Sequence, residues 1–205
     1  MATITNYATL QSTIADYLNR ADLTSQIQTF IQFAEADLNT RLRDRQMIVR
    51  AEATSNQEYV QLPSDWLEAL NLQLVGGKSP LRYITLDESD IVNSTQALTS
   101  PTFYSLMNGA IELVPPPASN VDIEMVYYGT IPSLSTAAPS NWLLVKAPDV
   151  YLYGALTHAA PFLMDDARMQ TFGQIYLARV QSLQDESQKS LHSGSPLIAR
   201  TRRVY

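Results

Sequence analysis

The segment over residues 148–187 places the strongest constraint on the fold of this chain. Its first part, 150–164, carries no charged side chain apart from His158, so a helix here has almost no polar face and must be covered nearly all round. The same part is too short, and too interrupted by Gly154 and Pro161, to span a membrane, which takes about 20 apolar residues. The segment therefore predicts a buried helix inside a helical core.

A second helix follows a corner at Asp165 and Asp166. These carboxylates suit the start of a helix, where unpaired N–H groups and the macrodipole favour negative charge. Apolar residues then recur at spacings of three and four and form one stripe, namely Met169, Phe172, Tyr176, Val180 and Leu183. The opposite side is predicted to carry Arg168, Gln174, Arg179, Gln181 and Glu186. We therefore predict an αα-hairpin with one buried arm and one half-buried arm.

The beginning of the chain supplies a cover for this hairpin. Apolar residues at helical spacing predict two amphipathic helices, over about 7–18 and 23–42, with a turn at 19–22 between them. We therefore predict a four-helix core built from both ends of the chain.

The middle of the chain has a different pattern. Eight of the eleven prolines fall between Pro63 and Pro139, which disfavours long helices there. The dipeptide Asn108-Gly109 between strand-like runs at 103–107 and 111–114 is typical of a type I′ hairpin. Further strands are predicted over 47–53, 58–62, 67–75, 81–84 and 122–128, and Thr85 and Glu88 fit a capping box for a short helix ending near Asn93.

These elements predict the α+β fold class, a four-helix core with an inserted small antiparallel β subdomain. The predicted boundaries are 1–45 and 141–190 for a discontinuous helical bundle, 46–140 for the β subdomain and 191–205 for an extended C-terminal arm.

Charge is distributed unevenly along the chain. The net charge is -6, but residues 188–205 carry four basic and no acidic side chains, so the preceding 187 residues carry -10. An acidic body is a poor binder of phosphates, and a basic tail is a candidate docking arm. Absence of cysteine excludes disulfides and thiolate metal sites.

No pattern in the sequence predicts catalysis. Gly77, Lys78 and Ser79 match the end of a phosphate-binding loop, but the required earlier glycine is missing and Pro80 follows, so we predict a turn. Two isolated histidines, His158 and His192, do not make a metal site, and no serine lies in a nucleophile elbow. We therefore predict no catalytic residues, no metal and no cofactor.

Two clusters of arginine have alternative interpretations. Arg41, Arg43 and Arg45 are either ordinary cations at a helix C-terminus or contacts to an acidic neighbouring subunit. The basic tail is either a frayed, solvated terminus or a segment that folds on binding. Apolar and aromatic residues flank its arginines and favour binding; the tail candidates are Leu197, Ile198, Arg200, Arg202, Arg203 and Tyr205. In isolation we expect residues 188–205 to be disordered.

Four stretches of the chain resemble one known family. They are DLTSQIQTFIQFAEADLNTRLRDR at 22–45, YVQLPSDWLEALNL at 59–72, PDVYLYGALTHAAPFLMDDARM at 148–169 and SGSPLIARTRR at 193–203. Together they are similar to the head-to-tail adaptor proteins of tailed bacteriophages. The resemblance covers nearly the whole chain and is looser in the β region.

That resemblance implies a structural virion protein rather than an enzyme. Members form a ring, usually of twelve copies, beneath the portal protein, and genomic DNA passes through the channel without specific binding. The implied portal contact is the arm at 193–205, and the far side receives the nozzle or another tail protein. Assembly in the host cytoplasm, without a membrane, is implied as well.

Two other functions fit parts of the sequence. A nucleic-acid-binding accessory protein would use the basic tail, but the -10 body opposes it. A tail-associated hydrolase would need acid and base residues converging in a cleft, and the sequence displays none.

Overall fold

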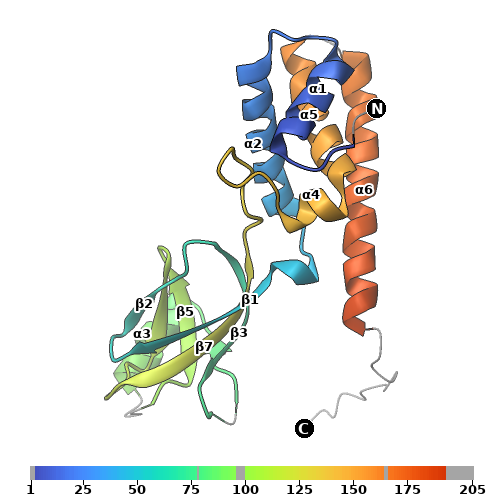
Figure 1. Cartoon of the computed structure of the whole chain (residues 1–205). Helices are drawn as coiled ribbons and strands as arrows, with labels where there is room; N and C mark the ends of the chain where they lie inside the picture. The colour runs from blue at the N-terminus through green and yellow to red at the C-terminus, as the bar shows by residue number, and fades with distance from the viewer. Residues whose placement is uncertain (1–2, 78, 96–99, 164–165, 193–205) are drawn as a thin grey trace. The chain divides into compact units, whose positions relative to one another are not determined.

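The protein divides into two compact units. The structure, a computed structural model, describes residues 3–77, 79–95, 100–163 and 166–192. One unit is built from both ends of the chain, up to Arg45 and from Ile131 onward, and the other is the insertion Gln46–Thr130 (Figure 1). The long helices lie in the first unit and both small sheets lie in the second, which also contains one short helix, and this confirms the predicted α+β fold class.

The helical unit is organised around one central helix. Its described α-helices are α1 (Tyr7–Leu18), α2 (Thr24–Arg41), α4 (Trp142–Lys146), α5 (Pro148–Phe162) and α6 (Asp166–His192). The central helix is α5, which contacts α1, α2, α4 and α6 (Figure 1). Its residues from Val150 to Leu152 and from Gly154 to Leu156 are buried, as are Ala159 and Ala160, and this confirms the buried helix.

Local sequence explains where α5 begins and how closely it packs. Pro148 occupies the first turn, where its missing N–H has no helical acceptor, and Pro161 lies in the last turn. A Cβ at Gly154 would lie 3.1 Å from the Cβ of Ala34 on α2 and 3.2 Å from Cε2 of Tyr176 on α6. The missing side chain therefore lets both neighbouring helices approach α5.

The long helix α6 presents the predicted stripe to the core. Tyr176, Val180 and Leu183 are buried. Arg179 was predicted on the opposite, polar side, and that placement is wrong: its guanidinium pairs with Asp149 on α5. Predicted roles for Asp165, Asp166, Arg168 and Met169 fall on residues or side chains outside the described part of the chain.

The helical conformation of α6 also extends past residue 187, where the sequence pattern weakens. The helix continues to His192. The prediction of disorder is therefore wrong for residues 188–192, which are helical. A buried Ser187, five residues before the helix end, anchors this part, because its Oγ accepts the Arg45 N–H at 2.9 Å.

The first two helices have the expected boundaries. Asn6 and Thr9 form a reciprocal capping box at the start of α1, and Asn19 ends it in the left-handed conformation with φ 51°. The stripe of α2 is buried at Ile27, Phe30, Ile31, Ala34 and Leu38.

The insertion contains two sheets that share one core. The strands are β1 (Ile48–Ser55), β2 (Tyr59–Gln61), β3 (Trp66–Leu74), β4 (Arg82–Tyr83), β5 (Phe103–Met107), β6 (Ala110–Val114) and β7 (Val121–Gly129). Their orders are β1-β7-β3 and β2-β6-β5-β4. Residues from both sheets form the core: Leu72, Leu81, Ile111, Leu113, Ile123, Met125 and Tyr127.

Strand pairing partly differs from the prediction of an antiparallel subdomain. The β5–β6 hairpin turns at Asn108 and Gly109 with φ of 43° and 78°, which confirms the type I′ turn. In contrast, β4 pairs with β5 in parallel, because the chain between them passes through α3 (Leu86–Thr95) and returns to the same end of the sheet. The two strands around Ser55, β1 and β2, belong to different sheets.

The segment that follows β7 belongs to the helical unit. The boundary lies after Thr130 rather than at residue 140. Asn39 Oδ1 accepts the Ile131 N–H at 2.8 Å, and Glu35 on α2 accepts the Leu134 N–H at 2.7 Å. Polar side chains of α2 thus hold a segment that has no periodic pattern of its own.

Candidate interaction surfaces

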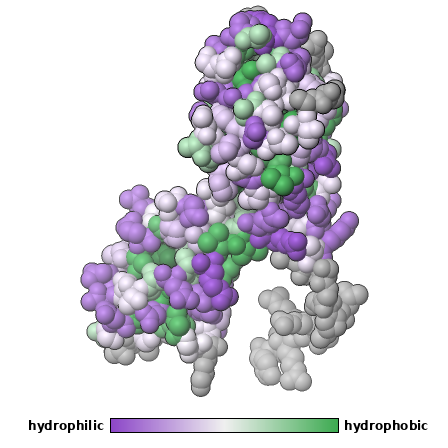
Figure 2. Space-filling view, viewed as in Figure 1, coloured by the Kyte–Doolittle hydropathy of each residue, from purple (hydrophilic) through white to green (hydrophobic). Residues whose placement is uncertain are grey.

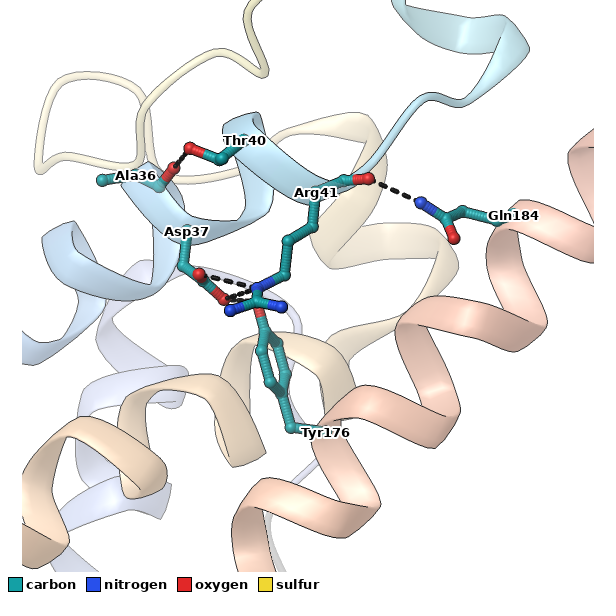
Figure 3. Close-up of polar contacts among 6 residues, drawn as sticks. All are labelled: Ala36, Asp37, Thr40, Arg41, Tyr176 and Gln184. Carbon is teal, nitrogen blue, oxygen red and sulfur yellow. Dashed lines mark hydrogen bonds and ion pairs between the residues drawn. The ribbon is translucent and has the colours of Figure 1, made fainter.

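A partly buried polar group joins α2 to α6. The Tyr176 hydroxyl donates to Asp37 Oδ2 at 2.8 Å, and Arg41 Nε donates to the same carboxylate at 2.7 Å (Figure 3). The side-chain amide of Gln184 donates to the Arg41 carbonyl at 2.5 Å. Burial is the larger cause and the Asp37 carboxylate the smaller cause of a raised pKa for Tyr176, so the proton stays on its hydroxyl. The group fixes the register of α6 on α2.

A second polar cluster lies where the chain leaves α2. Asp44 is fully buried, and Lys146 Nζ on α4 lies 3.1 Å from its carboxylate and 3.6 Å from Glu186 on α6. A buried carboxylate needs such a partner, since an unpaired one is strongly destabilising. The cluster joins α4, α6 and the end of α2.

The three arginines proposed as subunit contacts have different surroundings. Arg41 pairs with Asp37. Arg43 donates to the carbonyls of Asn39 at 2.8 Å and Leu42 at 2.7 Å, so it caps the C-terminus of α2. Arg45 has an exposed side chain and is the best placed of the three for an outside partner.

The proposed portal-binding residues lie outside the described part of the chain. They are Leu197, Ile198, Arg200, Arg202, Arg203 and Tyr205. Their role stays a prediction that rests on sequence and resemblance.

An exposed aromatic patch lies on α2 and α5. Phe33 and Phe162 are each 53% exposed. The Phe33 ring meets His158 edge-on at 5.8 Å, and Phe162 meets the buried Phe30 at 5.6 Å. His158, in the helix predicted to be buried, is therefore only half-buried, and burial lowers its pKa. The only sequence signal for an exposed Phe33 is its spacing, because it falls outside the apolar stripe of α2.

Most of the acidity of the body resides in the β unit. Residues 46–130 contain three basic and ten acidic side chains, a net charge of -7. One acid, Glu112, is buried and accepts hydrogen bonds from Ser89 on α3, at 3.1 Å, and from Ser105 on β5. Residues 1–187, predicted as one acidic body, therefore divide into a strongly acidic β unit and a helical part with a net charge of -3.

Other candidate sites have structural explanations or no support. Gly76 has φ 75°, and the Gly77 N–H donates to the Leu74 carbonyl at 2.8 Å, so the Gly-Lys-Ser motif begins in a tight turn. Among the described residues, no three His, Asp or Glu side chains converge to hold a metal ion. None of the helices in that part of the chain has the length and apolar character needed to cross a membrane.

Comparison with known families decides the class of this protein. The family model described as SU10 adaptor protein matches residues 5–200. The chain belongs to this family. A comparison with curated proteins gives no match. The SU10 adaptor proteins are a family of phage head-to-tail adaptors, so this protein is a virion component and the resemblance is confirmed.

For an adaptor, the functional sites are protein surfaces. The polar groups at Asp37 and Asp44 act inside the helical unit and hold its helices together. The exposed apolar residues are spread over both units, and the face seen in Figure 2 is mainly hydrophilic with separate small hydrophobic groups. The adaptor therefore offers partners chemically distinct surfaces: a helical unit with an aromatic patch, and an acidic β unit.

Proposed function

We propose that this adaptor forms a ring beneath the portal protein, extends the DNA channel and provides the attachment surface for the nozzle or another tail protein. Twelve subunits per ring is the expected number, from the resemblance to other adaptors. Assembly of such a ring takes place in the host cytoplasm, and genomic DNA passes through without specific binding.

The contrast of charge along the chain carries this proposal. Residues 188–205 carry +4, whereas the rest of the chain carries -10. Apolar and aromatic residues flank the clustered arginines, a composition suited to a peptide that orders on a protein surface. We assign the portal contact to residues 193–205, with Arg200, Arg202 and Arg203 as the charged contacts.

Two further observations support a ring around DNA. A closed ring with head-to-tail contacts needs two different patches per subunit, and the two compact units have different compositions. The acidic body, -7 in the β unit and -3 in the helical unit up to residue 187, would deny DNA the phosphate contacts that hold it non-specifically. Arg45 stays a candidate contact to a neighbouring subunit.

The decisive experiment is light scattering of the purified protein, alone and mixed with the portal of the same phage, followed by electron microscopy of the complex. A ring on the portal is the expected result, and its images give the copy number. Deleting residues 193–205 should leave the circular dichroism spectrum and melting temperature unchanged but abolish portal binding. Full affinity after the deletion would move the portal contact to another surface.

The basic tail also favours a second candidate, a nucleic-acid-binding accessory protein. Four cations would give weak binding to DNA that falls steeply with salt. A DNA titration at low and moderate salt distinguishes the two functions. An adaptor without its portal should not bind DNA at moderate salt.

A further inference from the structure

Strand β1 is a long, regular edge of its sheet in the β unit. It pairs with β7 from Ile48 opposite Tyr128 to Ser55 opposite Val121 without a shift in register. Within the described residues, no strand pairs with its other side. The eight residues of β1 include no proline and no bulge. An unpaired row of N–H and C=O groups on such a strand is a template for another strand.

The other sheet edges are less suited to receive a strand. The opposite edge, β3, has two register shifts, and its Leu72 carbonyl accepts the Leu81 N–H at 2.7 Å. The edges of the second sheet are β2, with three residues, and β4, with two. Short and irregular strands discourage pairing, so β1 is the edge best able to take up a strand.

A second copy of β1 can pair with this edge only in certain registers. In an antiparallel pair, two residues opposite each other either both direct their N–H and C=O groups at the partner strand or both direct them away. Two identical strands therefore pair about a residue that lies opposite its own copy. The longest such pairings of β1 join residues 48–54, centred on Ala51, or residues 49–55, centred on Glu52.

Charge distinguishes these two pairings. The register centred on Glu52 places that carboxylate opposite its own copy, and like charges directly opposite each other destabilise a sheet. The register centred on Ala51 places Arg50 of each strand opposite Glu52 of the other and so makes two pairs of opposite charge. Both charged side chains are exposed on β1. The sequence of this edge is therefore complementary to itself in one register.

Glu52 also lacks a cation within its own subunit. It lies opposite Glu124 on β7, and the nearby Arg50 pairs with Glu124 at 3.3 Å. In the part of the chain that the structure describes, Glu52 has no ion-pair partner of its own. The Arg50 side chain is still 67% exposed, so its guanidinium can approach a further carboxylate. A second copy of β1 would bring such an arginine to Glu52.

We propose that two copies of this chain associate through their β1 strands, antiparallel and centred on Ala51. The two three-stranded sheets β1-β7-β3 would then form one continuous sheet across a twofold axis. On the other face of the strand, Val49 of each copy would cover the exposed Ala53 of its partner. The contact satisfies the open backbone groups and the unpaired Glu52 at the same time.

This dimer goes beyond the proposed function and does not depend on it. A twofold contact uses the same patch on both subunits, whereas neighbours in a ring meet through two different patches. The dimer is therefore a form of the free protein. A net charge of -7 on each β unit opposes the approach of two copies, so the association is weak and reversible and can release subunits to the portal.

Disulfide trapping in the full-length chain tests the register, since the chain has no cysteine of its own. Ala51→Cys would place two cysteines directly opposite each other with Cα atoms about 5 Å apart, which suits a disulfide. The matched control is Ala53→Cys on the same face of β1, whose two copies would lie about 14 Å apart, too far for a disulfide. Ala53 is the more exposed of the two, so unspecific encounters would favour the control.

The two single-cysteine proteins should behave differently under mild oxidation. We expect Ala51→Cys to form covalent dimers about tenfold faster than Ala53→Cys, measured on non-reducing gels. Equal rates, or faster trapping of Ala53→Cys, would overturn the proposal. Unchanged circular dichroism spectra establish that both variants are folded.

Sedimentation velocity of the cysteine-free protein provides the second arm of the test. Glu52→Lys would place a cation opposite Arg50 of the partner, so we expect it to raise the Kd of the dimer about tenfold. Arg50→Glu combined with Glu52→Lys exchanges the charges and should restore the Kd. Asp90→Lys, at an exposed position on α3, makes the same change in net charge away from β1 and should not weaken the dimer. A Kd insensitive to Glu52→Lys, or a protein that stays monomeric at the highest concentration reached, would overturn the proposal.

Both arms separate this inference from the proposed function because they use no portal. A protein that forms a ring on the portal but shows neither the selective disulfide nor the charge dependence would retain the adaptor function and refute the β1 contact. A selective disulfide in a protein that does not bind portal would support the β1 contact and refute the adaptor function.

Discussion

The Tyr176 hydroxyl on α6 donates to the Asp37 carboxylate on α2 over 2.8 Å, 139 residues apart in the chain. Asp37 also accepts from Arg41 one turn further along α2. The carboxylate is thus shared between a cation on its own helix and a phenol on another. This arrangement joins α2 to α6 more specifically than apolar packing alone.

Replacing Tyr176 by Phe tests the contribution of that hydrogen bond. Asp37 keeps Arg41 as a partner, so we expect the free energy of unfolding to fall by about 1–2 kcal/mol rather than by the full penalty of a buried, unpaired charge. Urea unfolding followed by circular dichroism measures it. Tyr153→Phe is the matched control, since no hydrogen bond from its hydroxyl occurs among the described residues, and it should change stability by less than about 0.5 kcal/mol.

Tyr176→Asp should have a far larger effect. It places a carboxylate in the core, next to the partly exposed Asp37, and removes a buried aromatic ring. We expect a loss of more than about 3 kcal/mol, enough to unfold the helical unit of a marginally stable protein. A melting temperature equal to that of the original protein would show that this face of α6 is not part of the core.

Substitutions at two glycines of the helical unit should change the stability of the protein in opposite directions. A Cβ at Gly173 on α6 would meet Thr157 Cγ2 at 3.8 Å, an ordinary contact, so Gly173→Ala should stabilise the protein by about 0.5–1 kcal/mol through helix propensity. Gly154 is in contact with α2 and α6, so Gly154→Leu should destabilise it by about 1–3 kcal/mol or more. Thermal unfolding of both variants measures the difference. Stabilisation by Gly154→Leu would contradict the close packing around α5.

Glu35 combines a structural hydrogen bond with an unfavourable charge. Burial raises the pKa of its carboxyl despite the Leu134 N–H that it accepts. Because the folded-state pKa is above the unfolded value, ionisation at neutral pH opposes folding. Glu35→Gln keeps an acceptor and should raise stability slightly at neutral pH, whereas Glu35→Ala should lower it by about 1–3 kcal/mol. Urea titrations of the two variants distinguish these effects.

Stability should decline at alkaline pH. Burial, and to a smaller extent the Asp65 carboxylate, raises the pKa of Tyr127 from 10.0 to about 12. Burial also raises the pKa values of Tyr151 and Tyr176. The folded protein holds these protons more tightly than the unfolded chain does. Their contribution is therefore complete below pH 10 and falls between pH 10 and the folded-state pKa. Urea unfolding across this range should show the decline, and Tyr127→Phe should make it shallower.

Sequence patterns determined the elements whose signals are local. The α2 stripe, the buried α5 with Pro148 at its start, and the hairpin at Asn108-Gly109 all lie where the sequence predicts. Each depends on the spacing of apolar residues or on a backbone conformation that few residues adopt, and neighbours in the chain carry that information. The resemblance in four stretches likewise sufficed to predict the adaptor family.

Pairing between distant elements was decided by the tertiary structure. The separation of β1 and β2 into different sheets, the parallel pairing of β4, and the Arg179–Asp149 contact join residues with no periodic relation to one another. The same holds for the segment at 131–140, which side chains of α2 hold in place. Polar contacts of this kind arise from geometry across the fold, because a donor's partner depends on which helix or strand packs beside it. The sequence by itself therefore determined the elements and the family, and only the tertiary structure decided which side chains and strands are paired inside each unit.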